Sequence, residues 1–125
     1  MKALLIVAHG SRRSEANEQV RRLTQNIRNK VFNYYEKVDC AFLEIANPST
    51  QQSIDELVES GVKSIKLLPY FLTIGSHVEE DIPRIIKEKE KDYPDVQIEM
   101  MDYIGNHQGI FDIIIAQTTN SKTNE

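Results

Sequence analysis

Residues 3–11 read ALLIVAHGS, an uninterrupted apolar run from Ala3 to Ala8 followed by a polar turn that contains Gly10. A strand with one face in water alternates apolar and polar residues, whereas a strand covered on both faces is apolar throughout. The run therefore predicts a buried strand with helices on both sides. Because such strands belong to parallel sheets, this stretch points to the α/β class.

The rest of the chain repeats this alternation of apolar runs and helix-like segments. Further strands are predicted over residues 38–45, 62–68 and 96–101. Helices are predicted over 15–31, from Ser49 or Thr50 to Ser60, from close to Pro83 onward, and around 111–116. Pro83 sets the third start because proline fits a helix only in its first turn. With right-handed crossovers, this order predicts an α/β fold: a three-layer sandwich with a four-stranded, mainly parallel sheet flanked by helices.

The composition is that of a globular domain and excludes several classes of function. The chain has 125 residues, a formal net charge of −4 and a single cysteine, Cys40. One cysteine can form neither an intrachain disulfide nor a cysteine-cluster metal site, and we expect Cys40 to be a small core residue. The acidic balance argues against bulk nucleic-acid binding.

The chain is expected to form one domain over residues 1–117, followed by a polar, disordered tail over residues 118–125. No apolar run is long enough to span a bilayer, and the first apolar run is too short for the core of a signal peptide. We therefore expect a cytoplasmic protein.

Residues that can do chemistry stand where the predicted strands end. His9 follows the first strand, Glu44 lies near the end of the second and His77 follows the third. Functional groups of open α/β folds gather at the carboxyl ends of the strands. Two imidazoles and a carboxylate can hold a divalent transition metal and leave coordination positions open. Each residue also has a structural alternative: a histidine bonded to backbone, or a glutamate that points into solvent.

Several better-known catalytic motifs are absent. The patterns G-x-G-x-x-G, G-x-x-x-x-G-K-[ST] and G-x-S-x-G do not occur. Dinucleotide-binding, P-loop and nucleophile-elbow enzymes are therefore not supported. Histidine phosphatases carry an arginine directly before the histidine of their HG start, and here that position is Ala8.

Three colinear stretches resemble a known family. They are VAHGSRRSEANEQVRRL at 7–23, AFLEIANPSTQQSIDEL at 41–57 and LLPYFLTIGSHVEEDIP at 67–83. Together they look like the short, single-domain form of the sirohydrochlorin chelatases, the CbiX/SirB type of class II chelatase. The resemblance implies a chelatase-like fold that corresponds to half of the duplicated class II unit. It is weaker near the C-terminus, where the family often has a proline after the late histidine and this chain has Gln108 after His107.

The resemblance also implies an activity. Members insert cobalt, iron or nickel into sirohydrochlorin, a polycarboxylated tetrapyrrole, without ATP and without a nucleotide or organic cofactor. The products feed cobalamin- or siroheme-type biosynthesis. By position, His9 and His77 match the family's active-site histidines and Glu44 matches the acidic residue that assists them, so these three are the expected catalytic and metal-binding residues. Neutral imidazoles can bind such a cation and accept the pyrrole protons.

The carboxyl ends of the predicted strands and the loops that follow them are called the rim below. The other polar and aromatic residues of the rim are candidates for holding the tetrapyrrole. Arginines, hydroxyls and backbone amides at helix N-termini suit its carboxylates. Aromatic side chains could pack on the ring, although Phe71 could equally be a core residue. The candidate substrate-binding residues are Ser11, Arg12, Arg13, Asn47, Tyr70, Phe71 and Ser76.

The final helix points to a second copy of the chain as a partner. It carries more apolar positions than one core-facing stripe can bury, namely Ile110, Phe111, Ile113, Ile114 and Ile115. Exposed apolar surface of this kind marks an interface, so we expect a homodimer. The alternative is a helix packed on two sides within its own domain. The alternative function is a non-catalytic cobalt- or nickel-binding protein, or a tetrapyrrole carrier, that uses the same two histidines.

Overall fold

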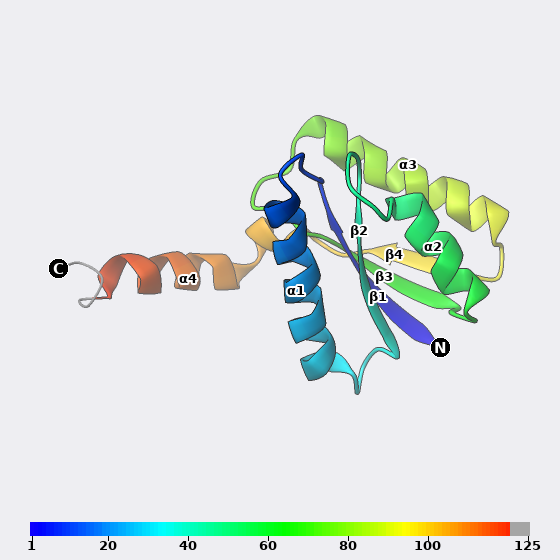
Figure 1. Cartoon of the computed structure of the whole chain (residues 1–125), viewed down its shortest axis with the longest axis horizontal. Coiled ribbons are helices and arrows are strands. Elements are labelled where there is room, and N and C mark those ends of the chain that lie inside the picture. The colour runs from blue at the N-terminus through cyan, green and yellow to red at the C-terminus, as the bar shows by residue number, and fades with distance from the viewer. Residues whose placement is uncertain (121–125) are drawn as a thin grey trace.

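The computed structural model describes residues 1–120. Four strands alternate with four α-helices, and one short 3-10 helix precedes the last of them (Figure 1). Their bounds are β1 Lys2–Ala8, α1 Ser14–Val31, β2 Lys37–Phe42, α2 Thr50–Glu59, β3 Ser64–Pro69, α3 Ser76–Asp92, β4 Gln97–Met100, η1 Ile104–Asn106 and α4 Gln108–Thr119. No helix in this part of the chain is long and apolar enough to cross a membrane.

The strands form one sheet in the order β2-β1-β3-β4, and every neighbouring pair is parallel. β1 lies inside the sheet, where Ile6 is paired with Cys40 on one side and with Leu68 on the other. Every residue of β1 from Ala3 to Ala8 is buried, as its continuous apolar run predicts. The predicted α/β fold is confirmed.

Alternate residues of β1 build two cores. Leu5 and Val7 belong to a large cluster with apolar residues of α2 and α3, whereas Leu4 and Ile6 pack in a smaller cluster that includes residues of α1. Burial of one such aliphatic side chain contributes about 1.5–3 kcal/mol. The sheet thus lies between α1 on one face and the α2–α3 pair on the other, which places the carboxyl ends of the strands at one edge.

A polar contact joins the two helices on the larger core. Asp55 of α2 accepts hydrogen bonds from Lys89 Nζ at 2.8 Å and from the Tyr93 hydroxyl at 2.7 Å. Burial pushes the pKa of the Asp55 carboxyl upward, but the bonds from Lys89 and Tyr93 and the charge of Lys89 outweigh it and lower that pKa. The hydrogen bond to Asp55, with some desolvation, raises the pKa of Tyr93 to about 12.

The expected start of the third helix is wrong. α3 begins at Ser76, and Pro83 lies inside it. Proline has no N–H to donate, so the helix lacks one intrahelical hydrogen bond there. The burial of Ile82, Ile85 and Ile86 against the sheet holds the helix across the proline. Tertiary packing therefore outweighs the local proline signal.

The second strand is shorter than expected. β2 ends at Phe42, and Ile45, the expected last residue, has a φ of 72° and is exposed. A positive φ turns the chain out of the strand direction. The turn ends in a cis peptide bond between Asn47 and Pro48, and Ser49 then caps α2 in a reciprocal capping box with Gln52.

α4 projects away from the rest of the molecule (Figure 1). None of its residues is buried, and Phe111 and Ile113–Ile115 are between 46 and 62 % exposed. The alternative that this helix packs on two sides within its own domain is therefore wrong. α4 runs to Thr119, two residues into the expected tail, and residues 121–125 of that tail lie outside the described residues.

Candidate functional site

His9 and Glu44 meet at the carboxyl ends of β1 and β2. His9 Nε2 lies 2.7 Å from Glu44 Oε1, and the two side chains are 56 and 58 % exposed. The pairing of the strands continues past their ends, since Leu43 N–H donates to the Ala8 carbonyl and Glu44 N–H to the His9 carbonyl. The backbone therefore sets the two side chains beside each other in a position that solvent and a ligand can reach.

Gly10 makes this close approach possible. Its φ is +99°, and a Cβ at this position would lie 1.8 Å from the Glu44 carbonyl oxygen. Only glycine avoids both the strain of the positive φ and the overlap. The turn after β1 therefore needs Gly10 to bring the His9 and Glu44 backbones together.

His77 lies elsewhere on the same rim. It is the second residue of α3, its side chain is 85 % exposed, and its Nε2 lies 3.0 Å from Asp81 Oδ2 one turn along the helix. The other oxygen of Asp81 accepts from Arg84 at 2.7 Å. Each candidate histidine thus pairs through Nε2 with a carboxylate. Such a contact fixes the ring orientation and leaves Nδ1 open.

The expected three-residue metal set is not gathered in one place. Among the described residues, no three His, Cys, Asp or Glu side chains lie close enough together to hold a metal ion. The single chain brings His9 to Glu44 but leaves His77 with Asp81. The metal role of these three residues stays a prediction.

The loop between β1 and α1 carries Ser11, Arg12 and Arg13. Both arginines are exposed, and Arg13 N–H donates to the Ser11 hydroxyl at 3.0 Å. Asn17 holds the Ser11 backbone by two hydrogen bonds and is only 8 % exposed. Sequence reasoning missed Asn17. The sequence does hold one indication that Asn17 is buried. It lies three positions before Val20, so it shares the inward-facing stripe of α1 with the apolar residues.

The remaining candidates are divided between surface and core. Tyr70 is 40 % exposed and, with Leu72 and Ile104, lines a hollow of about 280 Å³, whereas Phe71 also packs against the larger core. The core interpretation of Phe71 is thus supported, and its contact with the tetrapyrrole ring stays a prediction. Ser76 is exposed as the first residue of α3. The Asn47 carbonyl accepts a hydrogen bond from Arg21 Nη2 at 2.8 Å, which ties the loop after β2 to α1.

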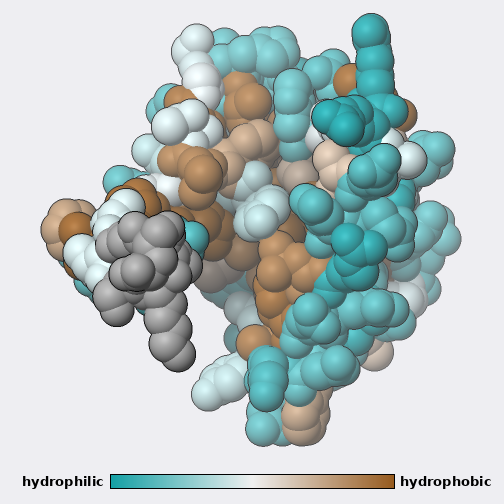
Figure 2. Space-filling model, turned by 60° about the vertical axis from the view of Figure 1, so that its left-hand side comes forward, coloured by the Kyte–Doolittle hydropathy of each residue, from teal (hydrophilic) through white to brown (hydrophobic). Residues whose placement is uncertain are grey.

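His107 has a structural role. Its Nδ1 accepts a hydrogen bond from Gly109 N–H at 2.9 Å, which caps the N-terminus of α4. The same histidine lines a hollow of about 560 Å³ together with Leu68, Met101 and Tyr103. Figure 2 shows hydrophobic residues gathered in a hollow beside the projecting C-terminal helix.

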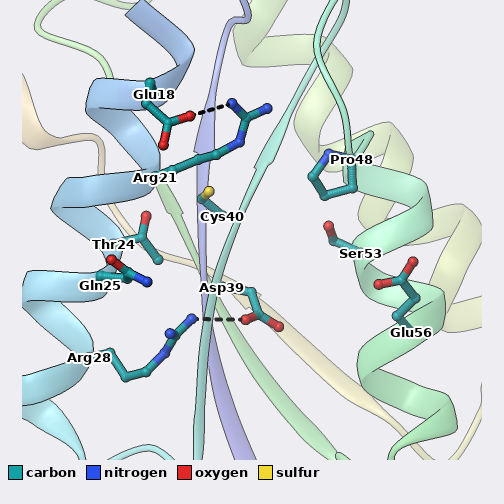
Figure 3. Close-up of a pocket in the computed structure, with 10 residues that line it drawn as sticks. All are labelled: Glu18, Arg21, Thr24, Gln25, Arg28, Asp39, Cys40, Pro48, Ser53 and Glu56. Atoms are coloured by element: carbon teal, nitrogen blue, oxygen red, sulfur yellow. Dashed lines mark hydrogen bonds and ion pairs between the residues drawn. The ribbon is translucent and has the colours of Figure 1, made fainter. Parts of the chain in front are cut away.

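A third opening lies away from the rim, along the outer edge of β2 between α1 and α2 (Figure 3). Its volume is about 410 Å³, and none of the expected site residues lines it. Arg28 crosses it to donate to the Val38 carbonyl and to pair with Asp39 at 3.3 Å. A side chain that occupies the free carbonyl of an edge strand protects that edge from pairing with another chain. Cys40 is half-buried there and also packs against the smaller core.

The chain is similar in sequence to proteins of known activity. The sirohydrochlorin cobaltochelatase of Methanococcus maripaludis is 35 % identical over 92 residues, which cover 74 % of this chain and 62 % of that protein. The chain thus spans less than two thirds of that relative's length. The sirohydrochlorin cobaltochelatase of Sulfolobus acidocaldarius is 30 % identical over 114 residues, which cover 91 % of this chain and 87 % of that one.

Solved structures share the fold. The sirohydrochlorin chelatase SirB from Bacillus subtilis, solved in complex with cobalt, superposes with a TM-score of 0.82 at 24 % identity over 95 % of this chain and 50 % of its own. The family model CbiX matches residues 3–121, nearly the whole described chain. This chain belongs to the CbiX family.

Proposed function

We propose that this protein inserts a divalent metal ion into sirohydrochlorin without ATP. The observation that carries the proposal is the solvent-accessible His9–Glu44 pair at the carboxyl ends of the strands, in a chain of the CbiX family. Relatives over most of the chain's length are named sirohydrochlorin cobaltochelatase. The cation and the tetrapyrrole are both substrates in this reaction.

The His9–Glu44 pair suits the chemistry of metal insertion. The two pyrrole N–H protons must be removed while the cation loses water and enters the ring. An imidazole that donates Nε2–H to a carboxylate keeps its other nitrogen free to bind a cation or accept a proton. Both side chains are more than half exposed, so a cation bound to them can be reached by water and by the tetrapyrrole. With only these few protein ligands it keeps open coordination positions and can pass into the ring. His77, with Asp81 beside it, is proposed as the second active-site histidine.

The tetrapyrrole lies across the rim in this proposal. Its carboxylates meet the guanidinium groups of Arg12 and Arg13, which are both exposed. Ser11, Asn47 and Ser76 add polar groups at the same edge, and Tyr70 and Phe71 offer apolar surface to the ring. A cytoplasmic location remains a prediction.

Cobalt and iron are the metals with the most support. Relatives are named sirohydrochlorin cobaltochelatase and sirohydrochlorin ferrochelatase, and SirB structures hold cobalt or Fe³⁺. Nickel is proposed because the same nitrogen and oxygen ligands bind it with comparable preference.

We also propose that the working form is a homodimer. α4 exposes an apolar surface, and the hollow beside it is lined by Leu68, Met101 and Tyr103. One copy thus carries two apolar surfaces, and a two-fold partner can cover both at once. The match to half of SirB supports a second copy in place of SirB's other half. The two rims would then face a shared cleft, in which His77 of one copy can complete the His9–Glu44 site of the other.

Turnover tests the function directly. The absorbance change of sirohydrochlorin is followed at catalytic protein concentrations with Co²⁺, Fe²⁺ and Ni²⁺ in parallel, and His9→Ala, Glu44→Gln and His77→Ala are each expected to lose most of the rate. Lys87→Ala, at an exposed position in the middle of α3, is the control for general effects on that helix. A signal that saturates at one metal or one tetrapyrrole per protein, without further turnover, favours the binding or carrier protein and contradicts the chelatase.

Light scattering tests the dimer. The wild-type protein is expected to be dimeric at micromolar concentration, and Ile114→Glu, which places a charge on the apolar face of α4, is expected to be monomeric and weakly active. Gln117→Glu adds the same charge to the same helix at a polar position and should change neither property. A wild-type monomer with full activity would contradict this part of the proposal.

A further inference from the structure

Asn17 makes an unusual pair of contacts for a residue inside a helix. Its side-chain Oδ1 accepts a hydrogen bond from Ser11 N–H at 2.9 Å, and its Nδ2 donates to the Ser11 carbonyl at 2.7 Å. Both bonds go to the backbone of one residue six positions earlier. The amide of Asn17 therefore pairs with Ser11 as a neighbouring backbone strand would.

This clamp acts on the middle of the β1–α1 loop, whose two ends are held by the bonds from Glu44 N–H to the His9 carbonyl and from Ala16 N–H to the Arg13 carbonyl. A buried amide needs both its donor and its acceptor satisfied, and Asn17 is only 8 % exposed. Ser11 meets both needs, so the side chain and the loop hold one conformation together. The Ser11 hydroxyl in turn accepts from Arg13 N–H at 3.0 Å.

Because Ser11 directly precedes Arg12 and Arg13, holding its backbone also holds the position from which the two arginine side chains extend. Gly10 packs against the Glu44 backbone on one side of the loop, and Ser11 is bound to α1 on the other. Between these anchors and the start of α1, Arg12 and Arg13 are exposed, and neither forms an ion pair with another described residue. A rigid loop presents two adjacent guanidinium groups at little entropic cost on binding.

We propose that Asn17 is a positioning residue that holds residues 11–13 in the shape that binds the carboxylates of the tetrapyrrole. This role rests on the proposed function. His9 is held independently, through the bond from Glu44 N–H to the His9 carbonyl. Asn17 therefore governs the affinity for the tetrapyrrole and leaves the His9–Glu44 pair intact.

Asn17→Asp tests this with almost no change in shape. The carboxylate can still accept from Ser11 N–H, but its second oxygen faces the Ser11 carbonyl across a contact that is 2.7 Å in the wild type. The two oxygens repel each other, and the loop must move. We expect the KM for sirohydrochlorin to rise about tenfold while kcat changes by less than about twofold, the signature of a group used for binding. The affinity for Co²⁺ alone, measured by calorimetry, should not change.

Gln19→Glu is the matched control, because it makes the same amide-to-carboxylate change at an exposed position of α1. Its KM should equal that of the wild type. Asn17→Ala removes both hydrogen bonds without adding charge, and it is also expected to raise the KM. It replaces Asn17→Asp as the test if that variant folds poorly. Amide hydrogen exchange at Ser11, which should be protected in the wild type and fast in Asn17→Ala, where the acceptor for Ser11 N–H is gone, reports the clamp without any activity measurement.

The outcomes separate this role from the function on which it rests. An unchanged KM in folded Asn17 variants with fast Ser11 exchange, or a fall in kcat at constant KM, overturns the positioning role alone. A wild-type protein that neither binds nor metallates sirohydrochlorin overturns the proposed function and this role with it.

Discussion

Gly10→Ala should separate the geometry of the site from the stability of the fold. Alanine at this position adopts a φ near +99°, which costs about 1–3 kcal/mol of folding free energy. Its Cβ also lies 1.8 Å from the Glu44 carbonyl oxygen, far inside the contact distance. The loop after β2 must therefore move away by more than an ångström.

That movement acts directly on the site. The His9–Glu44 contact is 2.7 Å and the backbone bond between the same residues is 3.0 Å, so a shift of this size breaks both. Misplacement of a reacting group by about 1 Å can reduce a rate about 100-fold, and we expect a loss of that order in metal insertion. The assay is the initial rate of the sirohydrochlorin absorbance change, with urea unfolding measured on the same samples.

Gly61→Ala is the matched control. Gly61 has a φ of +101°, and nothing lies within 4 Å of the position of a Cβ there. This variant carries the same backbone strain without the overlap and should lose stability while keeping the wild-type rate. If Gly10→Ala keeps the wild-type rate, or if both variants lose activity in proportion to stability, the geometric argument for the His9–Glu44 pair is refuted.

Three further predictions concern the cap, the alkaline range and the core. His107→Ala removes the acceptor for Gly109 N–H, so it should destabilise α4 by about 1 kcal/mol and reduce insertion far less than His9→Ala. The raised pKa of Tyr93, about 12, means that its stabilising hydrogen bond to Asp55 is fully present below pH 10 and is lost as pH rises through 12. Tyr93→Phe should therefore flatten the loss of stability over that range in pH-dependent urea unfolding. Ile54 is fully buried, so Ile54→Ala should cost about 2–5 kcal/mol in the same unfolding assay.

Each of these has a contrary result. Loss of activity in His107→Ala equal to that in His9→Ala would give the late histidine a role in the reaction. If the stability of Tyr93→Phe falls between pH 10 and 12 as steeply as that of the wild type, the hydrogen bond to Asp55 is not a source of stability. A cost well below 1 kcal/mol for Ile54→Ala would contradict the close packing of the larger core.

The buried strand β1 and the ends of α2 could be predicted from short stretches of sequence. The continuous run from Ala3 to Ala8 predicts a doubly covered strand, and β1 is buried along that whole run. The second helix was expected to begin at Ser49 or Thr50 and to end at Ser60, and α2 runs from Thr50 to Glu59 with Ser49 and Ser60 as its caps. Gly61 follows with a positive φ, the conformation that glycine supplies after a helix. Each of these depends on a few consecutive residues, so the pattern is visible in the sequence.

The departures arise where distant residues interact. The proline signal at Pro83 is local, but the burial of Ile82, Ile85 and Ile86 lies in the contact between α3 and the sheet and extends the helix across it. Asn17 looks like any polar helix residue until the loop folds back and places Ser11 against it. These outcomes were not predictable from spacing, because spacing does not show which loop meets which side chain.

The sequence by itself determined the fold class and the rim on which His9, Glu44 and His77 stand, because strand periodicity and strand order depend on the chain's own pattern of apolar residues. Only the tertiary structure decided that His9 pairs with Glu44 and that, among the described residues, His77 does not join them. The parallel pairing of β1 with β2, extended by the close contact at Gly10, sets two loops side by side. His77 meets Asp81 instead because one helical turn separates them, and residues four apart on a helix face each other.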